Sequence, residues 1–192
     1  MLDRPAAQLS ELAEITTNSD RRDILAHATR QARAHDDYEL VVDIDAHTVE
    51  FQFWDEIIGF VESDVLRHDA KAMLRGFSQG DALLNVPTGT NFQSVGGRIP
   101  HGHAIAEPTD DPGSGGHRFA QLMRRSMDAM GLDYQVVFPS AMLLLGLHTM
   151  DDVEVNLAQA FNRWIIESVL PSEDRLLGML YLPFNTPDAC IA

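Results

Sequence analysis

The sequence has little that would tie the protein to an oxidising compartment or to a membrane. It contains a single cysteine, Cys190, so no disulfide can form within the chain, and this fits a reducing cytoplasm. No stretch approaches the roughly 18 consecutive apolar residues of a membrane-spanning helix. Residues 1–15 also lack the apolar segment of a secretory signal. We therefore expect a cytoplasmic protein with no membrane partner.

Positive charge is also scarce, with 14 Lys and Arg against 29 Asp and Glu, a formal net charge of −15. A surface this acidic repels the phosphate backbone, so we expect no nucleic-acid partner. The rest of the composition, 45% hydrophobic and 22% charged over 192 residues, is typical of a globular domain that can bury a core.

The periodicity of apolar residues predicts helices that alternate with short apolar strands. Helices are expected at 6–16, 18–34, within 50–75, at 119–130 and at 151–170; strands at 38–47, 134–138 and 175–184; a further helix starting at 185–188; and a glycine-rich loop at 76–118. The helix at 119–130 is expected to have Leu122, Met123, Ser126, Met127 and Met130 on one face and to end at Gly131. In the last helix, Thr186 can act as the N-cap and Pro187 fits the first turn. This order predicts an α/β fold in which a parallel sheet is covered by helices. We divide the chain into an N-terminal helical extension, 1–37, and a main domain, 38–192.

The first strand ends in side chains that can bind a metal ion. Alternate residues of a strand share a face, so Asp43, Asp45 and His47 are expected to project to the same side. Three polar groups on the inner face of an apolar strand are costly unless something binds them. Carboxylate and imidazole both suit zinc or a similar divalent ion, and the pattern therefore indicates a metal site.

Three separate segments, in the right order, resemble one family. Residues 41–54 look like the D-A-D-x-H-V-x-E…W opening of the amidohydrolase-related branch of the amidohydrolase superfamily, which includes relatives of aminocarboxymuconate-semialdehyde decarboxylase. Residues 132–139 resemble its second strand, G-(I/L)-D-x-Q-V-L-F-P. Residues 160–183 resemble its A-Y-N-R-W-L…D-R-L-(I/L)-G…L-P helix and third strand. The resemblance covers about residues 40–190 and excludes the N-terminal helices.

The resemblance implies a metal-dependent (β/α)8 barrel in which Asp45 and His47 occupy the metal-ligand positions of the first strand. Asp45 departs from the family, because the decarboxylase relatives often have histidine there. A carboxylate adds negative charge and makes a bound ion less electrophilic. We expect zinc, with manganese or iron as alternatives, and a supporting role for Asp43.

Other candidate residues lie outside the first strand. Arg98 and His117, in or beside the glycine-rich loop, and His148, after the second strand, are candidates for binding substrate, with Arg98 suited to a carboxylate. His101 and His103 form a bare H-x-H pair, but Pro100 and Gly102 argue against the strand that a metal site there would need.

The resemblance ends within the third strand–helix unit, whereas a full barrel has eight in roughly 250 residues. The family's later ligands have no counterpart in this sequence. We therefore expect the N-terminal portion of a barrel, about three parallel strands preceded by two helices. A second polypeptide or the C-terminal half of a longer chain would complete it, and the assembly is expected to be oligomeric.

Three functional hypotheses follow. The first is a hydrolase that uses metal-activated water to cleave an amide or related C–N bond of a small molecule. The second is a metal-dependent, non-oxidative decarboxylase of an aromatic or unsaturated carboxylic acid. The third is a non-catalytic assembly subunit, and a metal-free α/β binding domain ranks behind all three.

Overall fold

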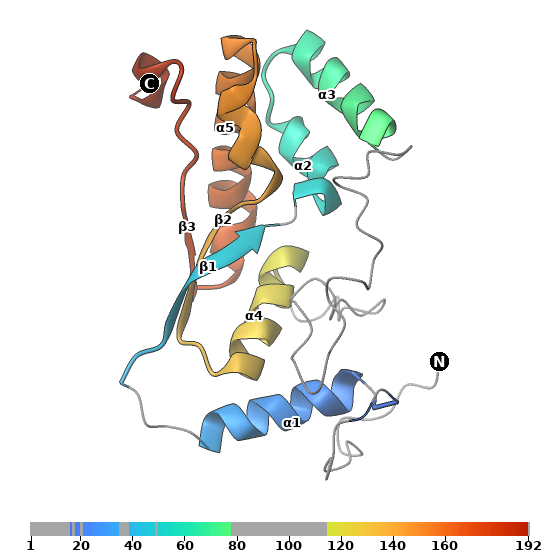
Figure 1. Cartoon of the computed structure of the whole chain (residues 1–192), viewed down its shortest axis with the longest axis vertical. Helices are drawn as coiled ribbons and strands as arrows, with labels where there is room; N and C mark the ends of the chain where they lie inside the picture. The colour runs from blue at the N-terminus through green and yellow to red at the C-terminus, as the bar shows by residue number, and fades with distance from the viewer. Residues whose placement is uncertain are drawn as a thin grey trace.

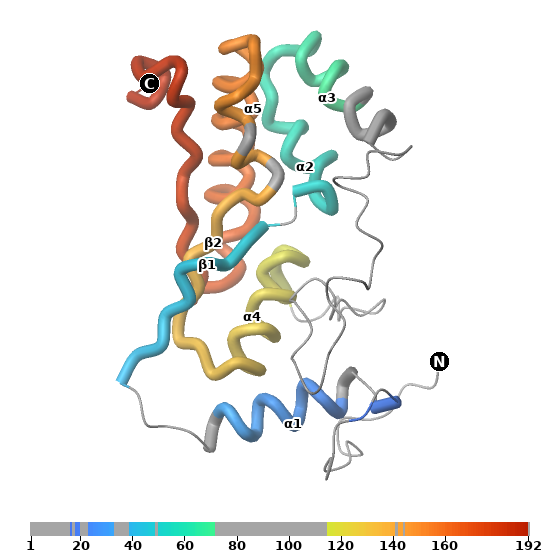
Figure 2. Tube along the Cα trace, in the orientation of Figure 1, coloured from blue at the N-terminus to red at the C-terminus, as the bar shows by residue number. Residues whose placement is uncertain are grey.

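A computed structural model describes residues 16, 18–19, 21–34, 39–48, 50–77 and 115–191 of the chain (Figures 1 and 2). The helices are α1 (Arg21–Ala34), α2 (Trp54–Gly59), α3 (Asp64–Phe77), α4 (Arg118–Met130) and α5 (Asp151–Trp164), and the strands are β1 (Val42–Thr48), β2 (Tyr134–Pro139) and β3 (Leu176–Gly178). Single-turn or 3-10 segments are η2 (Glu50–Gln52), η4 (Ala141–Leu147), η6 (Leu170–Ser172) and η7 (Pro187–Cys190), and a π-helical turn, η5 (Ile165–Val169), extends α5.

The three strands form one parallel sheet in the order β1-β2-β3, so the predicted α/β class with a parallel sheet is confirmed. Both connections between strands contain described helices, as is usual between parallel strands. The start of β1 is held by Asp133, whose carboxylate accepts the Val41 N–H at 2.7 Å and whose own N–H donates to the Val41 carbonyl at 2.9 Å.

The strands pair with one irregularity. Asp43 lies opposite Gln135, and Ala46 lies opposite Val137, so β1 has one more residue than β2 over this interval. The extra residue is a β-bulge, which breaks the strict alternation of side chains between the two faces. Side chains of register partners in a sheet lie on the same face. The bulge therefore determines which side chains of β1 lie on the same face of the sheet.

Helices bury one face of the sheet. Ala46, Val137 and Leu176 are at most 5% exposed, and they form one hydrophobic core with side chains of α2, α4 and α5. The largest fully buried members of that core are Trp164, Phe161, Ile57, Ile58, Met127 and Ile165. Apolar residues at i, i+3 and i+4 spacing provide these faces. In α4 the predicted face of Leu122, Met123, Ser126, Met127 and Met130 is buried except at Met130, which ends the helix and is 42% exposed.

The opposite face of the sheet exposes apolar side chains among the described residues. Ile44 is 73% exposed, Leu177 49% and Met179 51%. Leu176 and Leu177 show the asymmetry within a single strand, because the first is 4% exposed and the second 49%. A parallel sheet is normally covered on both faces, whereas in the described part of the molecule helices cover only one. We call this surface the open face.

Helix α1 lies across α4 near the start of the strands (Figure 1). Gly131 ends α4 with φ of 71°, in the left-handed region that the sequence predicted for a glycine after the helix. A Cβ on Gly131 would meet the Cβ of Ala32 in α1 at 3.0 Å. The glycine therefore ends one helix and also permits the close approach of the other.

Other predictions of local structure are wrong in part or lie outside the described residues. The third strand is paired only at Leu176–Gly178, much less than the predicted 175–184. Thr186 makes no side-chain capping hydrogen bond, so its predicted role as a helix cap is wrong, although Pro187 does begin a 3-10 turn. The predicted helix at 6–16 and most of the glycine-rich loop, with Arg98, His101 and His103, lie outside the described residues. In the described ranges, no helix has both the length and the apolar character needed to cross a membrane.

Candidate functional site

Asp45 and His47 lie together on the open face, near the end of β1. Oδ1 of Asp45 is 3.4 Å from Nε2 of His47. The His47 ring packs on Phe138, its register partner in β2, with ring centroids 4.2 Å apart. The side chain of His47 is 34% exposed and that of Asp45 83%.

Asp43 faces the other way, and the predicted common face for all three polar side chains is therefore wrong. Asp43 pairs in register with the buried Gln135, whose amide donates to Oδ2 of Asp43 at 3.0 Å. Its Oδ1 accepts the backbone N–H of Asp45 at 2.9 Å. The bulge is the physical cause, since it adds one residue between Asp43 and Ala46 and so puts Asp43 on the helix-covered face. Asp43 thus holds the bulged backbone of β1 at Asp45.

The other nitrogen of His47 is also engaged. Nδ1 lies 2.9 Å from Oγ of Ser140, the residue that follows β2. The Ser140 hydroxyl in turn donates to the Thr48 carbonyl at 2.7 Å. The imidazole is thus held from two sides, by Phe138 on its face and by Ser140 at Nδ1, while Nε2 faces Asp45.

An open pocket of about 740 Å³ adjoins Asp45. Its lining is almost wholly apolar or aromatic and comes from β1, β2 and the segments that follow β2 and β3: Ile44, Asp45, Phe138, Pro139, Leu143, Met179, Leu180, Tyr181, Leu182 and Phe184. The carboxyl ends of parallel strands are where ligands bind in barrels and open α/β sheets. The pocket therefore has the position expected of an active site.

Contacts with Asn162 of α5 and with Phe184 hold Tyr181 in this lining. Its backbone N–H donates to Asn162 at 2.8 Å, and its ring lies 5.4 Å from that of Phe184. Burial raises the pKa of the Tyr181 phenol, and the negative charge of Glu154 raises it further. Glu154 itself is fully buried and accepts the backbone N–H of Phe184 at 3.0 Å. Tyr181 is therefore a neutral phenol at physiological pH.

His117 lies in the helical layer and does not line the pocket beside Asp45. Its Nδ1 accepts the Phe119 N–H at 3.1 Å, which caps α4, and its Nε2 lies 2.6 Å from the carboxylate of Glu56. The Trp164 indole donates to the same carboxylate oxygen at 3.0 Å. These contacts join α2, α4 and α5, and they lend no support to the prediction that His117 touches substrate.

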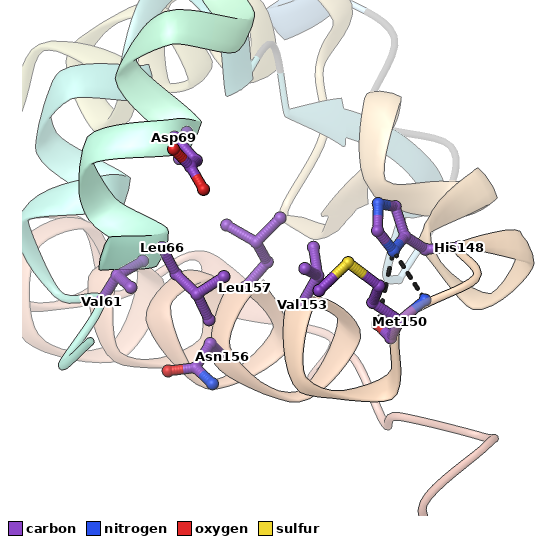
Figure 3. A pocket seen from close by; sticks show the side chains of 9 residues that line it. Val61, Leu66, Asp69, His148, Met150, Val153, Asn156 and Leu157 are labelled. Carbon is purple, nitrogen blue, oxygen red and sulfur yellow. Dashed lines mark hydrogen bonds between the residues drawn. The ribbon is translucent and has the colours of Figure 1, made fainter. Parts of the chain in front are cut away.

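His148 lines a different and smaller pocket, of about 200 Å³, between α3 and the start of α5 (Figure 3). Asp69 and His148 approach it from opposite sides, with Leu157 and Val153 between them (Figure 3). The Met150 N–H donates to Nδ1 of His148 at 3.1 Å and orients the ring. Of the predicted site residues, the structure thus brings together Asp45 and His47 and places His117 and His148 elsewhere.

The donors and spacing of the Asp45–His47 pair fit a divalent ion. Two donors each about 2.1 Å from one tetrahedral ion lie about 3.4 Å apart, which is the separation of Oδ1 and Nε2. Within the described ranges no group of three or more His, Cys, Asp and Glu side chains is arranged to hold a metal ion. The pair would therefore need further ligands from outside the described residues.

Sequence reasoning missed Ser140 and Phe138, which hold His47. Both follow or end the second apolar strand, and the only signal for them is that parallel strands put their carboxyl ends at one edge. Comparison of the chain with protein-family models, curated proteins and solved structures finds no match.

Proposed function

We propose that this chain forms the first part of a metal-dependent β/α barrel enzyme of the amidohydrolase-related type. One observation carries the proposal: a carboxylate and an imidazole, spaced for one ion, stand at the end of β1 on an apolar sheet face that no described element covers. In a barrel that face is the interior, and active sites lie at the carboxyl ends of the strands.

The open face supports the barrel over a free-standing α/β domain. A doubly wound sheet would place helices on both of its faces, whereas α2, α4 and α5 all pack on one. Further strands, from a second polypeptide or from more of the same chain, would continue the sheet past β1 and β3 and enclose Ile44, Leu177 and Met179. The additional metal ligands and the general base would come with them.

Asp45 and His47 would hold the ion, and zinc suits one carboxylate and one imidazole. A divalent ion there supplies Lewis acidity for activating water or polarising a carbonyl group. The chain's own residues orient the ligands. Phe138 covers the imidazole, Asp43 fixes the backbone of Asp45, and the apolar lining around Tyr181 receives the substrate. Hydrolysis of an amide or related C–N bond is the first proposal for the reaction.

Non-oxidative decarboxylation of an aromatic or unsaturated acid is the second. The pocket favours it in one respect, since the rings of Phe138, Tyr181 and Phe184 offer flat apolar contacts beside Asp45. The reaction products separate the two proposals. A hydrolase incorporates oxygen from labelled water into its product, whereas a decarboxylase releases carbon dioxide and incorporates none.

The test is turnover by the complete assembly with matched variants. Asp45→Asn and His47→Gln should each lower kcat by at least about 100-fold, because each removes a ligand whose replacement cannot hold the ion. Asp55→Asn is the control, an exposed carboxylate of α2 in the helical layer that does not line the pocket, and it should keep most of the activity. Full activity of the Asp45 and His47 variants would favour a non-catalytic assembly subunit instead.

A further inference from the structure

We infer that Ser140 is a positioning residue that sets the tautomer of His47 and so presents the free lone pair of Nε2 toward Asp45. The inference rests on the proposed metal function for its purpose, but its geometry stands independently. It makes Ser140, 93 residues away in sequence, part of the same site.

The Ser140 hydroxyl has a single proton, and its neighbours determine where that proton lies. Oγ of Ser140 and the carbonyl oxygen of Thr48 are 2.7 Å apart. A carbonyl oxygen carries no hydrogen, so two oxygens this close need the hydroxyl proton between them. Ser140 is therefore the donor to Thr48 and has only lone pairs left for other partners.

The contact with His47 then has one possible direction. Nδ1 of His47 is 2.9 Å from Oγ of Ser140, and since the serine has no second proton, Nδ1–H must donate. A neutral imidazole with a proton on Nδ1 has none on Nε2. The nitrogen that faces Asp45 thus carries a lone pair, which is the form that binds a metal ion.

The same proton count argues against a nucleophilic serine. Ser140, His47 and Asp45 make a chain of serine, histidine and aspartate that could be mistaken for a catalytic triad. A nucleophilic serine must donate its proton to the histidine that acts as base. Here the serine donates to a backbone carbonyl and accepts from the histidine, which is the opposite polarity.

The backbone fixes Ser140 in this role. Thr48 ends β1 opposite Pro139, the last residue of β2, so the carbonyl of Thr48 faces the next residue of the neighbouring strand. Thr48 is fully buried, and its hydroxyl reaches the Phe138 carbonyl at 3.3 Å. The acceptor that orients Ser140 therefore belongs to a rigid part of the sheet, and the orientation passes from the sheet through the hydroxyl to the ring.

The experiment measures the tautomer and the zinc affinity of the full chain, together with whatever polypeptide completes it. Long-range ¹H–¹⁵N spectra, with His47→Gln to assign the signal, should show Nδ1 protonated and Nε2 unprotonated in the metal-free wild type. This measurement needs no Ser140 variant, so a misfolded substitution cannot obscure it. Protonated Nε2 in the neutral ring would overturn the inference.

Zinc binding, measured by competition with a chelator, tests the consequence. Ser140→Ala should weaken zinc binding by about 10- to 100-fold, the usual effect of removing a partner that orients a ligating histidine. Ser140→Thr, which keeps the hydroxyl, should restore most of it. Unchanged affinity in Ser140→Ala, or labelling of Ser140 by a fluorophosphonate, would overturn the inference. A wild type that has the predicted tautomer but binds no zinc would instead overturn the proposed function.

Discussion

The two faces of the sheet can be compared with one pair of substitutions in β3. Leu176 and Leu177 are adjacent, chemically identical and on opposite faces, with exposures of 4% and 49%. Truncation of each to alanine removes the same atoms from two different environments. The difference between their effects on the free energy of unfolding therefore compares the packing on the helix-covered face with that on the open face.

The magnitudes follow from burial. Leu176→Ala leaves a cavity in the core and should lower the free energy of unfolding by about 3 kcal/mol, within the roughly 2–5 kcal/mol that such truncations cost. Leu177 has half of its surface in water, and its neighbours on that face can relax. Leu177→Ala should cost no more than about 1 kcal/mol in this chain alone. In a completed assembly the same substitution should cost about as much as Leu176→Ala.

The assay is urea denaturation followed by tryptophan fluorescence. Trp54 and Trp164 are 7% and 0% exposed, so both report loss of the core. The chain should be studied at low micromolar concentration with light scattering, since an uncovered apolar face favours self-association. Equal costs for the two variants in the monomeric chain would contradict the one-sided core, and so would a larger cost for Leu177→Ala.

Two further predictions concern stability. Burial opposes the charge of Glu173, but hydrogen bonds from Arg124 and Arg175 hold its pKa below the usual value. The carboxylate therefore stabilises the fold fully above its unfolded pKa, and this stabilisation is lost as pH falls through the lower pKa of the folded state. Glu173→Gln should therefore cost about 2 kcal/mol at neutral pH, and melting temperatures recorded against pH should converge with those of the wild type in acid; a constant gap at all pH values would refute the reasoning. Gly131→Ala should cost about 1–2 kcal/mol in thermal melts, because its backbone is left-handed and the new Cβ would lie 3.0 Å from that of Ala32. Gly59→Ala, with no atom within 4 Å of the new Cβ, should be neutral or stabilising. Equal effects of the two substitutions would contradict the left-handed conformation and close packing of Gly131.

The helices were predictable because their signals are local. The buried face of α4, its glycine stop and the long helix after residue 151 all follow from periodicity of 3.6 residues and from turn chemistry. The parallel sheet followed from the alternation of apolar strands with helices. These predictions depend only on neighbours within a few turns of the chain.

The wrong or missed predictions concern features that depend on contacts with a segment distant in the sequence. The bulge that turns Asp43 away from His47 belongs to the pairing of β1 with β2, and strict alternation within β1 cannot reveal it. The third strand is short because β2 ends at Pro139, which has no N–H to offer, so residues after Met179 find no partner there. Ser140 was missed for the same reason, since its contact with His47 spans the sheet.

Metal content tests the central claim most directly. Native assembly that contains this chain should be purified without added chelator and its divalent metal measured by mass spectrometry of the elements. We predict close to one ion per chain in the wild type and in Asp55→Asn, and a small fraction of that in Asp45→Asn and His47→Gln. A native assembly without bound metal, or one whose metal content is unaffected by the Asp45 and His47 substitutions, would contradict the account.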